Sequence, residues 1–140
     1  YIGLAHLHGL AGPATSWRGE ALASRGKVKF LCPVPGYDRH FTICEHFDIE
    51  MVNVSLGAEG PDMDAVEALA AADPLVKGIW CVPRYSNPTG HTYSDNVVRR
   101  FAGLARIAGE GFRIMWDDAY AVHHLADGPP PLLNLMDECR

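Results

Sequence analysis

The sequence predicts an α/β fold in which a mostly parallel sheet is flanked by helices. Short apolar stretches of the length of buried strands alternate with stretches whose apolar residues recur every three or four positions, the spacing of one helix face. This alternation is typical of parallel strands joined by right-handed helical crossovers. The strand-like stretches show little alternation of apolar and polar residues, which favours a sheet covered on both faces.

The first half of the chain supplies two of the expected strands. Residues 28–32 are mostly apolar and are followed by Pro33, so a strand should end in a loop at this point. Residues 37–47 follow a Pro-Gly turn and carry apolar side chains at helical spacing, which predicts a helix. Residues 51–56 predict the second strand, and residues 60–62 form a turn that starts the next helix.

The second half continues this pattern. Asp73-Pro74 should end the preceding helix, and residues 76–82 predict a third strand. Ser94-Asp95 is a suitable N-cap for a helix that ends at Gly109, and residues 112–116 predict a fourth strand. The apolar face of that helix is formed by Val97, Val98, Phe101, Leu104, Ala105 and Ala108.

Two segments are less regular. In the first 25 residues, Leu4 and Leu7 favour a helix, whereas Gly12-Pro13 and Trp17 favour a surface loop, and both interpretations stay open. Residues 129–131 are three consecutive prolines, which predict a stiff, extended connection within the domain.

The composition indicates one globular unit. The chain has 140 residues, of which 48% are hydrophobic and 21% are charged, enough to build a single core. Its formal net charge of −5 argues against nucleic acid as a partner, because binding to phosphate backbones needs a basic surface. Because Tyr1 is not an initiating methionine and Arg140 follows what should be structured chain, we expect a fragment of a longer protein.

Cysteine usage and hydropathy point to the cytoplasm. The four cysteines show no C-x-x-C spacing, and Cys32 and Cys81 fall inside strand-like stretches, so reduced core thiols are expected. No signal peptide or membrane span is recognisable in the sequence. We therefore expect a cytoplasmic protein without a membrane partner.

Polar residues follow the third and fourth predicted strands, where a ligand site is expected. Residues 83–90 read Pro-Arg-Tyr-Ser-Asn-Pro-Thr-Gly, and the fourth strand runs into Asp117-Asp118-Ala119-Tyr120. The carboxyl ends of parallel strands meet at one edge of the sheet, so Asn87, Asp117 and Tyr120 should converge. An amide, a carboxylate and a phenol suit the ring of pyridoxal 5'-phosphate, whose oxygen needs donors and whose pyridine nitrogen needs an anion.

Each of these residues also has a plainer interpretation. The prolines around Asn87 can hold its amide toward a ligand, or they can simply form a tight strand–helix connection. Asp117 can pair with a protonated pyridine nitrogen, or it can cap a helix or lie in a surface turn. Tyr120 can donate to the ring oxygen or lie on the rim, while Asp118 is expected to point away because two adjacent carboxylates repel.

Other candidates are weaker. Tyr37, after the first strand, could stack on a cofactor ring or could be the partly buried tyrosine of a Pro-Gly turn. Arg84 could grip a dicarboxylate or lie exposed at a strand end. The His6/His8 and His123/His124 pairs lack accompanying thiols or carboxylates at ligand spacing, so we expect no metal site.

Three segments of the sequence resemble a known family. Residues 31–41, 83–90 and 116–125, in that order, are similar to the class I/II aminotransferases of PLP fold type I, with the nearest likeness to the MocR-type branch that includes bacterial aspartate aminotransferases. The likeness extends from about residue 28 to residue 125. It implies that the chain is the central part of the large, PLP-binding domain of such an enzyme.

The resemblance implies roles for four residues and for the whole protein. Tyr37 would stack on the cofactor ring, Asn87 and Tyr120 would donate to its oxygen, and Asp117 would pair with its pyridinium nitrogen. Asp117 and Tyr120 would thus be the catalytic residues within this chain. The implied activity is transamination between an amino acid, L-aspartate, and a 2-oxo acid, 2-oxoglutarate, by a cytoplasmic homodimer.

Several features of that family fall outside this sequence. The Schiff-base lysine should come after Tyr120, the phosphate-binding loop before Tyr1, and the small domain with its carboxylate-binding arginine after Arg140. The chain as given should therefore not turn over. Two alternatives remain: the effector-binding domain of a MocR-type transcription regulator, and a remnant with structural value only, which would expose the edges of an incomplete sheet.

Overall fold

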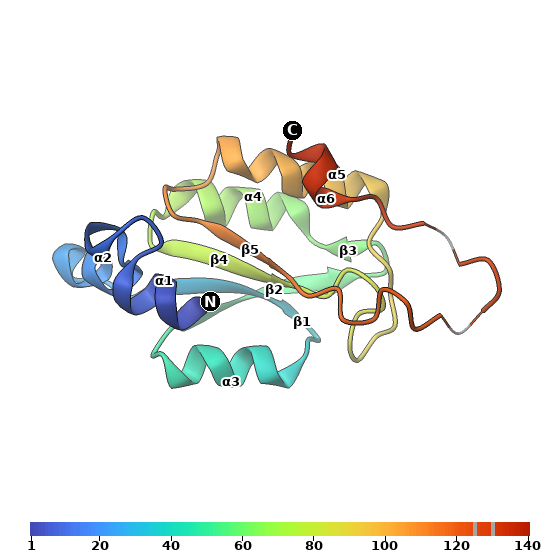
Figure 1. Cartoon of the computed structure of the whole chain (residues 1–140), viewed down its shortest axis with the longest axis horizontal. Coiled ribbons are helices and arrows are strands. Elements are labelled where there is room, and N and C mark those ends of the chain that lie inside the picture. The colour runs from blue at the N-terminus through green and yellow to red at the C-terminus, as the bar shows by residue number, and fades with distance from the viewer. Residues whose placement is uncertain (125, 130) are drawn as a thin grey trace.

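The fold is built on one mixed sheet. In the computed structural model, which describes residues 1–124, 126–129 and 131–140, five strands are arranged in the order β3-β2-β1-β4-β5 (Figure 1). The β1–β2, β1–β4 and β4–β5 pairs are parallel, and only the short β2–β3 pair is antiparallel. The predicted mostly parallel α/β sheet is confirmed. The strands are β1 Lys29–Val34, β2 Glu50–Gly57, β3 Gly60–Pro61, β4 Val76–Cys81 and β5 Arg113–Trp116.

Helices cover both faces of this sheet. α4, α5 and α6 lie on one side and α3 lies on the other, with α1 and α2 beside the amino ends of the central strands (Figure 1). The helices are α1 Ile2–His8, α2 Trp17–Ser24, α3 Asp38–His46, α4 Met63–Ala72, α5 Asp95–Gly103 and α6 Leu135–Glu138, and 3-10 turns occur at Pro13–Thr15 and Leu104–Arg106.

Alternate side chains of the central strands form two apolar layers. Leu31 of β1 and Ile79 of β4 pack toward α4 and α5, whereas Phe30 and Trp80 pack toward α1, α2 and α3. Gly78 leaves room for the Phe30 ring in the second layer, because a Cβ atom at this position would lie 2.5 Å from Cζ of Phe30. The central strands β1 and β4 are therefore buried on both faces, as the sequence predicted, whereas most residues of β2 are exposed or partly exposed.

The helix starts follow the expected capping chemistry. The side chain of Asp62 accepts hydrogen bonds from the backbone N–H groups of Asp64 and Ala65 at 3.1 and 3.2 Å. The hydroxyl of Ser94 accepts a hydrogen bond from the N–H of Val97 at 3.4 Å. Both caps satisfy backbone donors that have no partner within the helix.

Three predictions of local structure need correction. The helix predicted to end at Gly109 is shorter, because α5 ends at Gly103, a residue that stabilises a helix poorly, and the chain continues as a 3-10 turn. Ala105, which was expected on the apolar face of this helix, is therefore exposed. Residues 60–61 form the short strand β3 before α4 begins. The first 25 residues hold the helices α1 and α2, and Trp17, which we associated with a surface loop, is only 1% exposed.

The strand ends also differ from the prediction. β1 runs through Pro33 to Val34, because the register with β4 ends at Leu31 and the missing N–H of Pro33 therefore interrupts no bond to that strand. All residues of β5 are partly exposed, since β5 is an edge strand of the described sheet. Leu125, the last residue of the third family-like segment, and Pro130 lie outside the described residues.

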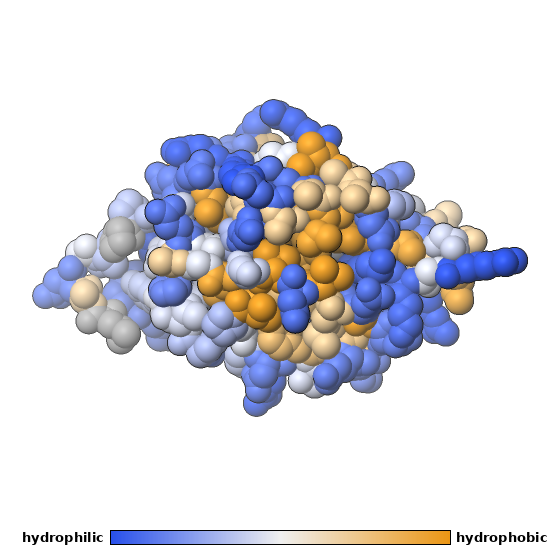
Figure 2. All heavy atoms as spheres, turned by 180° about the vertical axis from the view of Figure 1, so that it is seen from behind, coloured by the Kyte–Doolittle hydropathy of each residue, from blue (hydrophilic) through white to orange (hydrophobic). Residues whose placement is uncertain are grey.

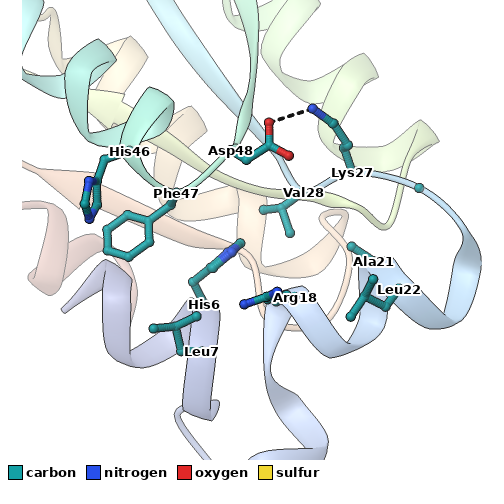
Figure 3. A pocket seen from close by; sticks show the side chains of 11 residues that line it. His6, Leu7, Arg18, Ala21, Leu22, Lys27, Val28, His46, Phe47 and Asp48 are labelled. Carbon is teal, nitrogen blue, oxygen red and sulfur yellow. Dashed lines mark hydrogen bonds and ion pairs between the residues drawn. The ribbon is translucent and has the colours of Figure 1, made fainter.

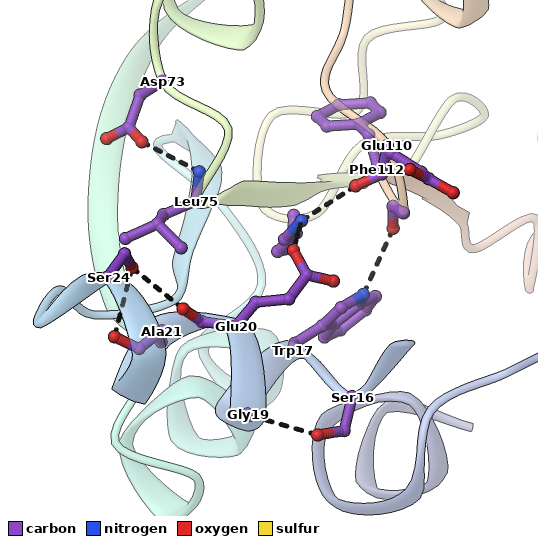
Figure 4. Close-up of polar contacts among 12 residues, drawn as sticks. Ser16, Trp17, Gly19, Glu20, Ala21, Ser24, Asp73, Leu75, Glu110 and Phe112 are labelled. Atoms are coloured by element: carbon purple, nitrogen blue, oxygen red, sulfur yellow. Dashed lines mark hydrogen bonds and ion pairs between the residues drawn. The ribbon is translucent and has the colours of Figure 1, made fainter. Parts of the chain in front are cut away.

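A buried ion pair joins α2 to the amino ends of β4 and β5. The Nζ atom of Lys77, whose side chain is 1% exposed, donates to Glu20 Oε2 at 2.5 Å and to the carbonyl oxygen of Glu110 at 2.8 Å. Beside it, Nε1 of Trp17 donates to the carbonyl of Gly111 at 3.2 Å (Figure 4). These bonds fix α2 against the sheet at the edge opposite the predicted ligand site.

The surface combines polar regions with one apolar area. Figure 2 shows that hydrophobic residues gather into a continuous area on the face turned away in Figure 1, with hydrophilic residues around it. Cys32, Cys44 and Cys81 are buried free thiols, as predicted, whereas Cys139 is exposed, so the prediction of a core thiol is wrong for Cys139. Within the described part of the chain, no helix is both long and apolar enough to cross a membrane.

Candidate active site

The predicted site residues lie beyond the carboxyl ends of three neighbouring strands. Tyr37 follows β1, Asn87 follows β4 and Asp117 directly follows β5. Since these strands are parallel, their carboxyl ends share one edge of the sheet (Figure 1). The chain leaves β1 for β2 on one side and later enters β4 on the other, so this edge contains a topological switch point, where open α/β sheets bind ligands.

Backbone bonds hold the loop that carries Asn87. The hydroxyl of Ser86 donates to the carbonyl of Val82 at 2.6 Å, and the N–H of Ser86 donates to the carbonyl of His91 at 2.7 Å. The N–H of Tyr93 donates to the carbonyl of Pro83 at 2.9 Å, and burial raises the pKa of the Tyr93 phenol. The loop is therefore closed at its base, and its orientation over the sheet edge is fixed.

Asn87 and Tyr120 are in direct contact. The amide nitrogen Nδ2 of Asn87 donates to the phenol oxygen of Tyr120 at 3.3 Å, although the two residues are 33 positions apart. Both side chains are partly buried. The structure thus brings together the two groups that the sequence analysis expected to act on the same cofactor oxygen.

Asp117 is oriented by a histidine that the sequence analysis did not identify. The backbone N–H of Asp117 donates to the carbonyl of Cys81 at 2.8 Å, which continues the β4–β5 pairing. Its Oδ2 atom lies 2.9 Å from Nε2 of His40, whose side chain is 7% exposed, whereas the Asp117 side chain is 37% exposed. One carboxylate oxygen is thus engaged by His40, and the group remains open to solvent on another side.

Tyr37 completes this cluster from the start of α3. Its ring meets the ring of His40 edge to face, with centroids 5.2 Å apart and an interplanar angle of 84°. One crevice is lined by Tyr37, His40, Asn87, Trp80 and Tyr93. Because His40 contacts Asp117 and Asn87 contacts Tyr120, this crevice connects the two pairs. Its volume is about 20 Å³, so a ring-shaped ligand would lie over its open side.

The residues present fit the ring of pyridoxal phosphate. The Asn87 amide and the Tyr120 hydroxyl are neutral hydrogen-bonding groups side by side, as a phenolic ring oxygen requires. The half-exposed carboxylate of Asp117 is an anion with an oxygen to spare, as a protonated ring nitrogen requires. The aromatic face of Tyr37 beside them can pack on a flat heterocycle.

Other residues singled out from the sequence are not in this cluster. Asp118 is exposed and lines a different cavity together with Arg84 and Trp116. Arg84 is only 9% exposed, so the interpretation of an exposed arginine at a strand end is wrong. His124 is exposed, and its Nδ1 atom lies 2.9 Å from the hydroxyl of Tyr85, which joins the Asn87 loop to the segment after Tyr120.

A larger cavity lies away from these residues. It has a volume of about 450 Å³, is found between α1, α2 and the segments that lead into β1 and β2, and contains none of the predicted site residues (Figure 3). His6 points into it beside Arg18, and burial and the nearby Arg18 lower the pKa of the His6 imidazole. This cavity lies at the amino ends of the strands, opposite the candidate site.

No metal cluster is found in residues 1–124, 126–129 and 131–140: no three histidine, cysteine, aspartate or glutamate side chains stand together in a metal-binding group. His6 is buried next to the cavity of Figure 3, and His8 is exposed. The histidines that raised the question of a metal thus occupy unrelated surroundings.

The fold is that of a class I/II aminotransferase. The family model for aspartate amino-transferase matches residues 1–140, and the chain belongs to this family. The match includes the first 27 residues, which the three sequence segments had left out.

Individual relatives agree with this assignment. The chain is 54% identical over 121 residues to a Mycolicibacterium smegmatis protein named as an aminotransferase. The matched segment covers 86% of this chain and 27% of the relative. It is 50% identical over 109 residues to an aspartate aminotransferase of Corynebacterium glutamicum, which covers 78% of this chain and 25% of that enzyme.

A solved structure shows the same fold. The crystal structure of an aminotransferase from Corynebacterium diphtheriae superimposes with a TM-score of 0.88 at 46% identity, over 99% of this chain and 32% of that one. The chain therefore spans between a quarter and a third of the length of these relatives.

Proposed function

We propose that this chain is the central part of the large domain of a pyridoxal phosphate-dependent aminotransferase that exchanges an amino group between L-aspartate and 2-oxoglutarate. The observation that carries the proposal is the placement of the Asn87–Tyr120 pair and the His40–Asp117 pair at the switch point of the sheet. The substrate choice is supported by 50% identity to a relative named as an aspartate aminotransferase.

Pyridoxal phosphate, when bound, supplies a ring that accepts electron density from the substrate's α-carbon. Asp117 would hold a proton on the ring nitrogen through its ion pair, because an adjacent anion favours the charged form of a base. His40 holds Oδ2 of Asp117, which leaves Oδ1 for that contact. Asn87 and Tyr120 would orient the ring through its oxygen, and Tyr37 would pack on its face and exclude water.

The remaining parts of the site would come from other segments of the full-length protein. We infer that a lysine after Tyr120 attaches the cofactor and that a loop before Tyr1 binds its phosphate. We also infer a cytoplasmic homodimer whose partners are amino acids and 2-oxo acids, without nucleic acid or membrane. The apolar area of Figure 2 supports the inference of a partner subunit, because monomeric proteins rarely expose large continuous apolar areas.

Absorption spectroscopy of the full-length protein tests the proposal. We expect a visible band from lysine-bound cofactor that L-aspartate bleaches and 2-oxoglutarate restores, because the two half-reactions run in opposite directions. A protein that binds the cofactor without this response would be an effector-binding regulator of the MocR type, and a protein that binds none would contradict the proposal.

A matched pair of variants tests the assigned residues. Asp117→Ala should lower the rate of bleaching by several orders of magnitude, because the ring nitrogen loses its anion. Asp118→Ala is the control, since its carboxylate is the next residue, is exposed and lines another cavity. Equal rates in the two variants would show that Asp117 does not have the role given to it.

A further inference from the structure

Trp80 of β4 contacts the side chain that orients Asp117. Its indole ring stacks on the imidazole of His40 with the centroids 4.1 Å apart and an interplanar angle of only 5°. Trp80 is 9% exposed and His40 is 5% exposed, so water has little access to this stack. Both residues line the crevice at the switch point.

The stack fixes the direction in which His40 presents its nitrogen. The Nε2 atom points outward in the plane of the imidazole ring, and a hydrogen bond weakens steeply when its angle departs from linearity. The Trp80 indole packs on one face of the His40 imidazole and so holds its ring plane. Tyr37 makes a second aromatic contact, edge to face, with the same imidazole. The 2.9 Å contact between Nε2 and Asp117 Oδ2 depends on that plane.

The indole is itself held in place. Its Nε1 atom donates to Sγ of Cys44 on α3 at 3.3 Å, and its ring packs on Phe30 with centroids 5.8 Å apart. The neighbouring Cys32 thiol and the hydrogen bond from the Trp80 indole both lower the pKa of Cys44. A chain of contacts thus runs from the layer beneath α3 to the carboxylate at the sheet edge.

We propose that Trp80 is a positioning residue for the cofactor site: it holds the His40 ring, and through His40 it holds Asp117 in the orientation that a ring nitrogen requires. This inference rests on the proposed function, since it assigns Asp117 to the cofactor. Trp80 acts through His40 and needs no contact with the cofactor itself.

Trp17 offers a matched control for ordinary core packing. It is 1% exposed, its Nε1 atom also donates one hydrogen bond, to the carbonyl of Gly111 at 3.2 Å, and its ring packs on the same Phe30 with centroids 5.6 Å apart. Its hydrogen bond lies at the opposite edge of the sheet, beside Lys77. Replacing Trp17 therefore removes comparable packing without touching the His40 stack.

The first measurement is the NMR signal of the His40 imidazole in the full-length protein without cofactor. A ring stacked on an indole face is shifted upfield by the ring current, so we expect an upfield signal that moves downfield in Trp80→Leu. Trp17→Leu should leave it in place. Trp80→Phe keeps an aromatic face and should restore most of the shift, and it remains informative where the leucine variant folds poorly.

The second measurement is the dissociation constant for pyridoxal phosphate. We expect Trp80→Leu to weaken binding by about tenfold, the loss that follows when one hydrogen bond to a charged group is misaligned, with recovery in Trp80→Phe and little change in Trp17→Leu. An unmoved His40 signal, or equal weakening by Trp80→Leu and Trp17→Leu, would overturn the inference. Failure of the proposed function would look different, because the unmodified protein would then bind no cofactor, while the His40 signal would still test the stack.

Discussion

The buried ion pair between Lys77 and Glu20 leads to an asymmetric prediction for stability. The ammonium group of Lys77 is 1% exposed and has two acceptors, Glu20 Oε2 and the carbonyl of Glu110, whereas the Glu20 side chain is 37% exposed (Figure 4). Removing the carboxylate leaves a charge inside the protein. Removing the lysine leaves a carboxylate that water can reach.

The magnitudes follow from this difference in exposure. An uncompensated buried charge costs about 3–5 kcal/mol, and the remaining carbonyl and the amide oxygen of glutamine should reduce this, so Glu20→Gln should cost about 2–3 kcal/mol. Lys77→Met keeps an unbranched side chain that is one atom shorter and removes the buried charge, so it should cost about 1 kcal/mol or less. The double variant should resemble Lys77→Met alone, because no buried charge is left.

Urea unfolding followed by far-UV circular dichroism measures these free energies. Lys77→Met should rescue most of the loss caused by Glu20→Gln, which appears as a coupling energy in the double-mutant cycle. A larger loss for Lys77→Met than for Glu20→Gln would show that the unpaired ammonium group is not the main source of the loss. Additive losses in the double variant would show that the two side chains do not act as a pair.

Three further predictions concern a cap, an ion pair and the cofactor site. Ser94→Ala should destabilise the protein by about 1 kcal/mol in urea unfolding, because Val97 loses its cap, while Ser94→Gly should cost only a few tenths. The Arg100 hydrogen bond lowers the pKa of Glu67. This pair therefore stabilises the fold at a pH above the ordinary glutamate pKa and loses its effect as the pH falls through the lowered value. The difference in melting temperature between the unmodified protein and Arg100→Gln should shrink from pH 7 to pH 3. Tyr120→Phe should weaken binding of pyridoxal phosphate about fivefold, because one hydrogen bond is lost.

Each of these predictions has an opposing outcome. Equal losses in Ser94→Ala and Ser94→Gly would mean that the hydroxyl does not cap α5. A pH-independent difference for Arg100→Gln would show that the pair with Glu67 does not titrate as described. Unchanged cofactor affinity in Tyr120→Phe, measured by absorbance titration, would remove Tyr120 from the site.

The sequence was sufficient for the parts of the site that depend on strand order. Asn87 and Asp117 each follow an apolar stretch of strand length, and parallel strands place their carboxyl ends at one edge, so their proximity to one edge could be predicted. The same logic predicted that Tyr37 lies near this edge, and Tyr37 follows β1 in the structure. The contact between Asn87 and Tyr120 agrees with that logic, although its geometry needed the structure.

Contacts between distant side chains could not be predicted in this way. His40 reaches Asp117 across 77 positions, and in the sequence it is one more polar residue in the first turn of a helix. Trp80 was counted only as part of a buried strand, because its stack with His40 depends on how α3 lies over the sheet. Trp17, together with Gly12-Pro13, favoured a surface loop in a segment whose interpretation stayed open, while its burial depends on packing against Phe30.

A crystal structure of the full-length protein with pyridoxal phosphate bound would show whether these residues surround the cofactor ring. We expect Oδ1 of Asp117 to lie within hydrogen-bond distance of the ring nitrogen, with His40 still on Oδ2, and both Asn87 and Tyr120 to reach the ring oxygen. A ring bound elsewhere would contradict the assignment of these residues. Side chains of Asn87, Asp117 and Tyr120 that lie too far apart to surround one ring would contradict it as well.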